Sequence, residues 1–417
     1  RETFVVWERA SGKPVHRAIV WQCRRSSEIC ARLHEREREV AERTGLIVDP
    51  YFSGTKLKWL LDENPALRAR GARAELCFGT IDTWLIYRLS RGSAFLTDYT
   101  NASRTMLMNL RSREWDASML DMLGVPREML PAPVSSRGVL AEAAAGTITS
   151  RAVPIGAVIG DQQSALFGQG GVNKGDSKST YGTGAFLLAH TGDEMVASRN
   201  RLVTTSALGA DGQPAYALEG SVFVAGAAIQ WLRDGLRLIK RAARSQALAR
   251  RSRDRTQPYL VPAFVGLGAP HWDPDARGAI LGITRGTTRE DLVRAALDSI
   301  AYQVTDVIDA MRSDTGRALT ELRADGGAAE NDYLMQFQAD LLGCPVRRAK
   351  MAEATALGAA MLAGLAVGVW RGPDDLAALR KDGRVFRPRM VAEERTRLLS
   401  GWRDAVARVK SPASSRA

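Results

Sequence analysis

The sequence predicts an α/β protein of two domains, and three observations lead to that prediction. The apolar run 157–160 ends abruptly at Asp161, a pattern typical of a strand followed by polar residues at its carboxyl end. Residues 322–325 read as a second strand, followed by the pair Gly326-Gly327 and by an amphipathic helix from Asn331. The chain has 417 residues, more than one hydrophobic core usually supports, and its 45% apolar content is ordinary for a globular protein.

The first expected domain comprises residues 1–169 and mixes strands with helices. In chain order we expect a strand around Val5, a strand at 18–20, helices at 27–33, 55–62 and 81–89, and a strand at 157–159.

The second expected domain comprises residues 170–390, and residues 391–417 follow it as a C-terminal helix and a disordered tail. In chain order we expect strands near 178–191, 202–208 and 214–219, a helix at 289–313, a strand at 320–325, helices at 331–342 and 354–367, an amphipathic helix at 391–409 and disorder at 411–417. The helix at 354–367 has small residues at helical spacing, which suits close packing on a sheet.

Asp161 is the first candidate for chemistry. Open α/β sheets bind ligands outside the carboxyl ends of their strands, so a carboxylate at that edge can act as a general base. An Asp at the start of 162–167 can equally cap a helix by accepting hydrogen bonds from free backbone N–H groups. The residues alone leave both interpretations open.

Two glycine-rich turns point towards phosphate. In residues 181–184, Tyr-Gly-Thr-Gly follows the strand-like stretch 177–180, and glycines let backbone N–H groups approach a phosphate closely. An ordinary hairpin turn explains that segment equally well. Gly326-Gly327 before the helix from Asn331 is a nucleotide-friendly arrangement, although plain packing between strand and helix is the commoner reason for such a pair.

Composition argues against other classes of protein. The net charge of +12 and the pI near 9.9 would suit a nucleic-acid binder. However, the densest basic run, residues 240–255, lacks the aromatic residues that stack on bases, so we expect a solvated surface there and no nucleic-acid partner. No apolar run approaches the length of about 20 residues that a membrane span needs, so no membrane partner is expected. Four cysteines without paired metal spacing or a disulfide framework indicate the cytoplasm.

Longer patterns then connect the chain to a family. Residues 51–63 and 278–298 resemble the two signatures of the FGGY carbohydrate kinases. Similarity to the glycerol kinase branch of that family extends along nearly the whole chain, in the blocks 18–25, 97–104, 160–163, 262–270 and 355–360.

The resemblance implies an actin- and hexokinase-like (ribonuclease H-like) ATPase fold, with two domains around a catalytic cleft that binds glycerol on one side and ATP·Mg²⁺ on the other. The substrate-binding residues that it implies are Arg1, Glu2, Trp21, Tyr51, Asp161, Gln162 and Phe186. The nucleotide-binding residues that it implies are Thr183, Gly226, Gln230, Gly327 and Asn331.

Elementary chemistry is compatible with these assignments. Arg1 and Glu2 supply donors and acceptors for vicinal hydroxyl groups, while Trp21 and Phe186 would form an apolar wall, although without the resemblance core aromatics would be the likelier interpretation. Small residues at 225–228 would let a helix N-terminus approach an anion, and a tightly packed helix start is the alternative.

The implied reaction is direct in-line transfer of the γ-phosphoryl group to a terminal hydroxyl of glycerol, giving sn-glycerol 3-phosphate, with Asp161 as general base and Mg²⁺ spreading the charge. The chain offers no metal cage of its own, since its four histidines are scattered. Two rival functions remain at this point: a kinase for another polyol or ketose, and a relative that binds ligands without turnover.

Two departures from the family pattern set further expectations. The family's phosphate-binding Asp-x-Gly-Thr-Thr-Ser hairpin is found nowhere in the 417 residues, so the sequence reads as an N-terminally truncated piece, which we expect neither to fold fully nor to turn over alone. Residues 143–151 replace a Gly-rich effector loop, so inhibition by fructose 1,6-bisphosphate is not expected. The family also implies a homodimer or homotetramer.

Overall fold

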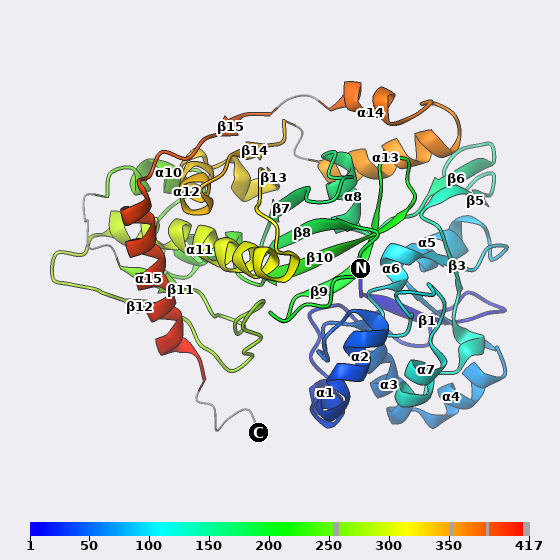
Figure 1. Ribbon diagram of the computed structural model, residues 1–417. Coiled ribbons are helices and arrows are strands. Elements are labelled where there is room, and N and C mark those ends of the chain that lie inside the picture. Colours follow the sequence, from blue (N-terminus) through cyan, green and yellow to red (C-terminus); the bar gives the residue numbers. More distant parts are fainter. Residues whose placement is uncertain (253–257, 351–352, 381–382, 412–417) are drawn as a thin grey trace.

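A seven-stranded mixed sheet forms the centre of the computed structural model, which describes residues 1–252, 258–350, 353–380 and 383–411 (Figure 1). Its strands pair in the order β15-β14-β13-β7-β8-β10-β9; β13 is parallel to β7 and β14, and the other neighbours are antiparallel. The bounds, in that order, are Val385–Phe386, Val346–Arg348, Leu322–Asp325, Ser177–Tyr181, Ala185–Gly192, Pro214–Val222 and Val203–Leu208.

Helices cover both faces of this sheet, and the alternation of side chains along the strands explains why. Leu218 on β10 belongs to the large core cluster that includes the long helix α11, whereas its neighbour Ala217 packs with Leu166 of α8 on the other face. The elements with α11 around the large cluster are α9, α10, α12 and α15, and those with α8 are α13 and α14. Their bounds are Asp161–Gly168 (α8), Gly226–Asp234 (α9), Arg244–Ala249 (α10), Arg289–Thr315 (α11), Asp332–Leu342 (α12), Ala354–Ala366 (α13), Pro373–Leu379 (α14) and Ala392–Val409 (α15).

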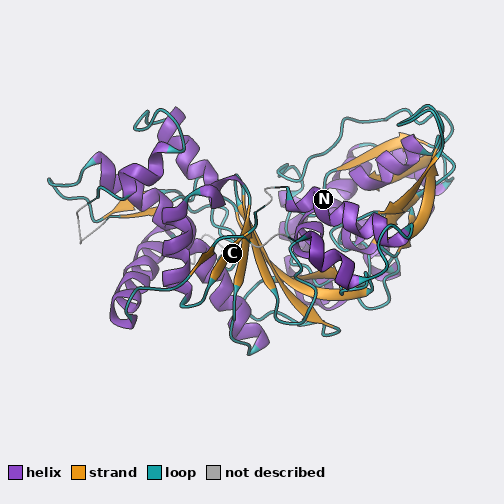
Figure 2. Ribbon diagram, turned by 90° about the horizontal axis from the view of Figure 1, so that it is seen from above, coloured by secondary structure: helices purple, strands orange, loops and turns teal. Residues whose placement is uncertain are grey.

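Residues 1–157 form a second lobe beside the sheet, built from helices and strand pairs (Figure 2). The helices are Ser27–Leu33 (α1), Glu37–Thr44 (α2), Ser53–Glu63 (α3), Pro65–Ala72 (α4), Ile81–Leu89 (α5), Tyr99–Ala102 (α6) and Ala117–Leu123 (α7). The pairs are β1 (Phe4–Glu8) with β2 (Leu76–Thr80), β3 (Leu96–Asp98) with β4 (Ala132–Val134) and β5 (Arg137–Ala143) with β6 (Val153–Ala157); outside this lobe, β11 (Tyr259–Val261) pairs with β12 (Ala279–Leu281).

The edge strand β9 joins the two lobes. The backbone N–H of Thr204 donates to the carbonyl of Gly45 at 2.8 Å, and the hydroxyl groups of Thr205 and Ser103 lie 3.0 Å apart. Arg1, just before β1, donates to Glu219 of β10 and to Gln163 of α8, so the start of the chain lies beside β10 and α8, where the site described below is found.

Most expected elements are confirmed. The helices expected at 27–33 and 81–89 have those bounds, and Leu398 and Trp402 bury the apolar face expected of the helix at 391–409. The strand expected at 18–20 is wrong, because Ile19 makes only one isolated bridge, to Phe4. Of the expected disordered tail, Ser411 hydrogen-bonds Asp273, and 412–417 lie outside the described residues.

The helix α13, expected in the second domain, packs on α8, β5 and β6. The domain limits at 169 and 390 stay predictions. No helix among the described residues is long and apolar enough to cross a membrane.

Candidate active site

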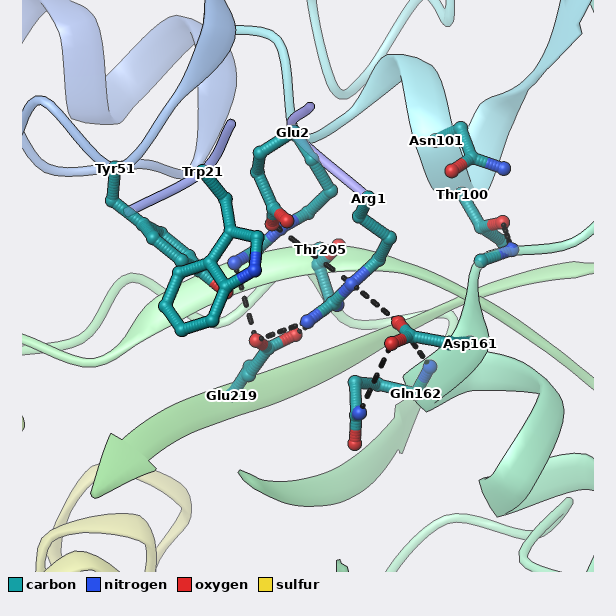
Figure 3. Close-up of polar contacts among 12 residues, drawn as sticks. Arg1, Glu2, Trp21, Tyr51, Thr100, Asn101, Asp161, Gln162, Thr205 and Glu219 are labelled. Atoms are coloured by element: carbon teal, nitrogen blue, oxygen red, sulfur yellow. Dashed lines mark hydrogen bonds and ion pairs between the residues drawn. The ribbon is translucent and has the colours of Figure 1, made fainter. Parts of the chain in front are cut away.

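Asp161 begins helix α8, at the point where both lobes meet (Figure 3). The buried strand expected directly before it is wrong: β6 ends at Ala157, pairs within the described residues with β5 alone, and has one buried residue, Gly156, among its five. One face of β6 lies close to α13, since a Cβ on Gly156 would come within 3.0 Å of the Ala363 carbonyl oxygen. The apolar residues before Asp161 thus pack against a helix. Hydrophobicity alone does not distinguish such a contact from burial within a sheet.

Gly160, and not Asp161, is the N-cap of α8; Asp161 is the first residue of the helix, and its role as a base stays a prediction. One oxygen of the Asp161 carboxylate accepts the N–H of Gln162 at 2.8 Å, at the positive end of the helix, and lies 2.9 Å from Nε of Arg1. The side chain is nevertheless 52% exposed, so the carboxylate remains accessible to a ligand. Burial would raise the pKa of Asp161, but the charges of the Arg1 guanidinium, of the amino group at residue 1 and of Lys178 outweigh it and lower the pKa to about 2.

Four charged side chains alternate in sign beneath Asp161. Arg1 donates to both oxygens of Glu219, at 2.7 and 3.0 Å, and Arg104 donates to Glu219 at 3.1 Å and to Glu2 at 2.8 Å. All four side chains are almost completely buried. Burial alone would raise the pKa of Glu219, but the two guanidinium groups lower it.

Glu2 is held in an unusual backbone conformation. Its φ is +57°, in the left-handed region that is uncommon for residues other than glycine. Its carbonyl accepts a hydrogen bond from the Ser53 hydroxyl at 2.8 Å, and its carboxylate binds Arg104. The surroundings thus compensate a strained residue at the site, a frequent feature of functional positions.

Three aromatic rings from distant segments meet beside these charges. Trp21 lies edge-on to Tyr51, with 5.6 Å between ring centroids, and to Phe186, at 6.3 Å. Tyr51 is buried, whereas Trp21 and Phe186 are partly exposed. The seven predicted substrate residues therefore lie in one group, with an apolar side and a charged side.

The turn at 181–184 is a tight connection between β7 and β8, as the hairpin interpretation expected. Gly182 and Thr183 are exposed, and their carbonyls accept the N–H groups of Gly226, Ala225 and Ala227 at 2.8–3.1 Å. The start of α9 is therefore packed against this turn. The expectation that its free N–H groups approach an anion is wrong for these three donors, which are already satisfied.

The Gly326-Gly327 turn lies against the same hairpin. Gly326 has φ +89°, and a Cβ there would lie 2.6 Å from the Tyr181 carbonyl oxygen. Gly327 is exposed, and a Cβ on it would meet nothing within 4 Å. Helix α12 begins directly after Asn331, as the amphipathic pattern predicted, and Asn331 caps it by accepting the N–H of Leu334 at 3.1 Å.

The predicted nucleotide residues form a looser group than the substrate residues. Thr183 lies in the turn that packs on the start of α9 at Gly226. Gly327 begins the short helix Gly327–Glu330 and Asn331 follows it, whereas Gln230 is exposed on α9. Asn331 donates to the hydroxyl of Ser245 on α10, at 3.3 Å. The described part of the basic run 240–255 is mostly exposed around α10, as expected.

Sequence reasoning missed three buried charges of the site: Arg104, Glu219 and Lys178. Glu219 stands alone in the apolar strand β10, and a single acidic residue in such a strand signals a paired charge. Nothing local, however, identifies its partners. Within the described residues, no three His, Cys, Asp or Glu side chains gather into a group that could hold a metal ion.

Comparison with known proteins adds independent findings. Models of the FGGY family of carbohydrate kinases match residues 1–168 with the N-terminal domain and residues 178–367 with the C-terminal domain. Glycerol kinase 2 of Pseudomonas aeruginosa is 54% identical over 412 residues, and glycerol kinase of Geobacillus kaustophilus is 54% identical over 408 residues. The alignments cover 98% and 97% of this chain and 82% of each relative.

A solved structure agrees with these sequence relationships. The crystal structure of Plasmodium falciparum glycerol kinase with ADP superposes with a TM-score of 0.91 at 36% identity. The match covers 99% of this chain and 83% of that one.

Proposed function

We propose that this chain, which belongs to the FGGY family of carbohydrate kinases, is a kinase that phosphorylates glycerol with ATP to give sn-glycerol 3-phosphate. The observation that carries the proposal is the accessible carboxylate of Asp161, held between Arg1 and Gln162 in a chain 54% identical to proteins named glycerol kinase. These relatives favour glycerol over another polyol or ketose.

The group of predicted substrate residues suits a small triol. Arg1 and Glu2 offer charged donors and acceptors for adjacent hydroxyl groups, and Gln162 adds an amide beside Asp161. The Trp21, Tyr51 and Phe186 rings provide an apolar surface for the carbon chain. A site that hydrogen-bonds hydroxyl groups in this way discriminates strongly against analogues that lack them.

The reaction needs one proton acceptor. A terminal hydroxyl oxygen of glycerol attacks the γ-phosphorus, the bond from that phosphorus to the bridging oxygen breaks, ADP leaves, and the hydroxyl proton passes to Asp161. A pKa of about 2 makes Asp161 a weak base, but it keeps the carboxylate ionised at neutral pH. Such a base suffices because the transition state of phosphoryl transfer is loose and depends mainly on positioning and charge stabilisation.

The nucleotide is proposed to lie along the hairpin turn and the glycine pair, near Thr183, Gly226, Gln230, Gly327 and Asn331. The open space at Gly327 and the exposed turn at Thr183 support this placement. Mg²⁺ would enter with the phosphates and neutralise their charge. Asp161, a half-exposed carboxylate, is the residue here whose chemistry suits a further ligand to it.

Two finer features belong to the same proposal. The cytoplasm suits a chain whose cysteines Cys23, Cys30, Cys77 and Cys344 are all free thiols. A homodimer or homotetramer stays a prediction, to be measured by light scattering after size-exclusion chromatography.

The test is release of ADP from ATP·Mg²⁺ by the protein expressed from its complete gene. Glycerol, dihydroxyacetone, erythritol, xylulose and ribulose are compared as acceptors. We expect the highest kcat/KM with glycerol, and a loss of about 10²- to 10⁴-fold in kcat for Asp161→Asn, the usual contribution of a general base. A preference for a ketose, or an active Asn variant, would overturn the substrate or the base respectively.

A further inference from the structure

Lys178 on β7 is a fully buried cation next to the proposed site, and none of the assignments above gives it a task. Its side chain has no exposed surface, although lysine is almost never buried without partners. Burial lowers its pKa to about 8, against the opposing influence of Asp325, Asp161 and Glu219. A buried charge of this kind seldom repays its desolvation in stability, which directs attention to what it positions.

All three protons of the Lys178 ammonium group have acceptors. One goes to Oε1 of Gln162, one to the Thr180 hydroxyl at 2.8 Å and one to the carbonyl of Phe186 at 3.3 Å. Thr180 and Phe186 are paired across the β7–β8 ladder, just before the exposed turn at Thr183. The ammonium group therefore links this hairpin to the start of α8.

The contact with Gln162 determines which way its amide faces. An ammonium group can only donate, so the amide must present its oxygen to Lys178 and its NH₂ group to the other side. On that other side Nε2 lies 3.4 Å from Oδ2 of Asp161. Gln162 is itself 93% buried, so its side chain has little freedom to turn.

The Asp161 carboxylate is consequently supported at both oxygens. Oδ1 meets Arg1 and the N–H of Gln162, and Oδ2 meets the amide that Lys178 orients. We infer that Lys178 is a positioning residue for the phosphoryl transfer: through Gln162 it holds Asp161 in the orientation that accepts the proton of the substrate hydroxyl. This inference rests on the proposed function, because it assigns the reacting carboxylate to Asp161.

A double-mutant cycle tests the route through Gln162. Lys178→Met, Gln162→Leu and the double variant are compared with the wild-type protein from the complete gene, at saturating glycerol and ATP·Mg²⁺. We expect Lys178→Met to lower kcat by about 10- to 100-fold in the wild-type background, since small misplacements of a catalytic group cost that much. In the Gln162→Leu background the same change should lower kcat less than about 3-fold, because the link is already broken.

Two further variants keep the experiment decisive. Lys178→Leu, which also removes the donor to Gln162, replaces Lys178→Met in the cycle if the methionine variant does not fold, as judged by its thermal unfolding. Ser179→Ala, at a buried neighbour on the same strand, is the matched control and should keep the wild-type kcat.

The outcomes separate this inference from the proposed function. Equal losses in both backgrounds, or an unchanged kcat in Lys178→Met, overturn the positioning role while glycerol phosphorylation stands. A wild-type protein that prefers another acceptor overturns the substrate, and the cycle measured with that acceptor still decides the role of Lys178. A wild-type protein without turnover on any acceptor overturns both.

Discussion

Arg104 and Glu219 form an ion pair of 3.1 Å in which neither side chain has any exposed surface. The pair lies under Arg1 and Glu2, the two residues proposed to bind the hydroxyl groups of the substrate, and each member binds one of them. The substrate side of the site is therefore supported from below by charges that never meet solvent.

Glu219→Gln should be strongly destabilising. It leaves two buried guanidinium groups facing a neutral amide, and breaking a buried ion pair typically costs about 3–5 kcal/mol of unfolding free energy. Urea unfolding followed by circular dichroism measures the change. Glu194→Gln, at an exposed ion pair with Lys174, is the matched control and should unfold with the wild-type midpoint; equal midpoints for all three proteins would contradict the prediction.

Removal of the charge on Arg1 should change the dependence of activity on pH. The lowered pKa of Asp161 keeps its carboxylate ionised down to about pH 2, so the wild-type kcat/KM should show no acid limb from Asp161 above about pH 4. In Arg1→Met the pKa should rise by about 1–3 units and bring an acid limb into the measured range. Profiles of kcat/KM for glycerol, measured from pH 4 to 9, test this prediction. The Arg1→Lys variant keeps the positive charge and should retain the wild-type profile.

The same shift gives the sign of a stability effect. The pKa of Asp161 is lower in the folded protein than the usual value near 3.9, so the stabilisation is present above that value and is lost as the pH falls towards 2. Because half of the side chain is exposed, solvent screening keeps this contribution small. Asp161→Asn lacks this stabilisation, so its deficit in unfolding free energy relative to the wild type should be small, should be largest above about pH 4 and should disappear as the pH falls towards 2.

Alanine substitutions at two adjacent glycines should have different effects: one should lower the stability of the fold, and the other should weaken nucleotide binding. Gly326→Ala places a methyl group 2.6 Å from a backbone oxygen at a φ of +89°, and it should lower the melting temperature by several degrees, with a cost of about 1–3 kcal/mol. Gly327→Ala meets open space and should leave the melting temperature unchanged while raising KM for ATP. Calorimetry measures the melting temperatures, and initial rates measure KM for ATP. An unaltered KM for ATP in Gly327→Ala would contradict the placement of the nucleotide at Gly327.

Trp21→Ala should weaken glycerol binding selectively. The ring contacts both Tyr51 and Phe186, and loss of its apolar surface should raise KM for glycerol about 10-fold, equivalent to about 1.4 kcal/mol. KM for ATP serves as the internal control and should change less than 2-fold. A parallel rise in both constants would indicate that Trp21 acts through packing of the lobes.

Local sequence patterns determined much of this protein. Apolar spacing predicted α12 and α15, the polar residues after an apolar run identified Asp161, and the glycine pair placed the turn before Asn331. Each of these signals depends on neighbours within one or two turns of the chain. The strand at 18–20 and the buried strand before Asp161 failed because an apolar run records burial without naming the surface that buries it.

Only the tertiary structure decided how the site is supported. Arg1 meets Glu219 across 218 residues, and Arg104 meets Glu2 across 102 residues. Lys178 on strand β7 reaches Gln162 on helix α8 and determines which way its amide faces. Such pairings have no local period, because their energy comes from burying opposite charges together, and that depends on which distant segments the fold brings into contact.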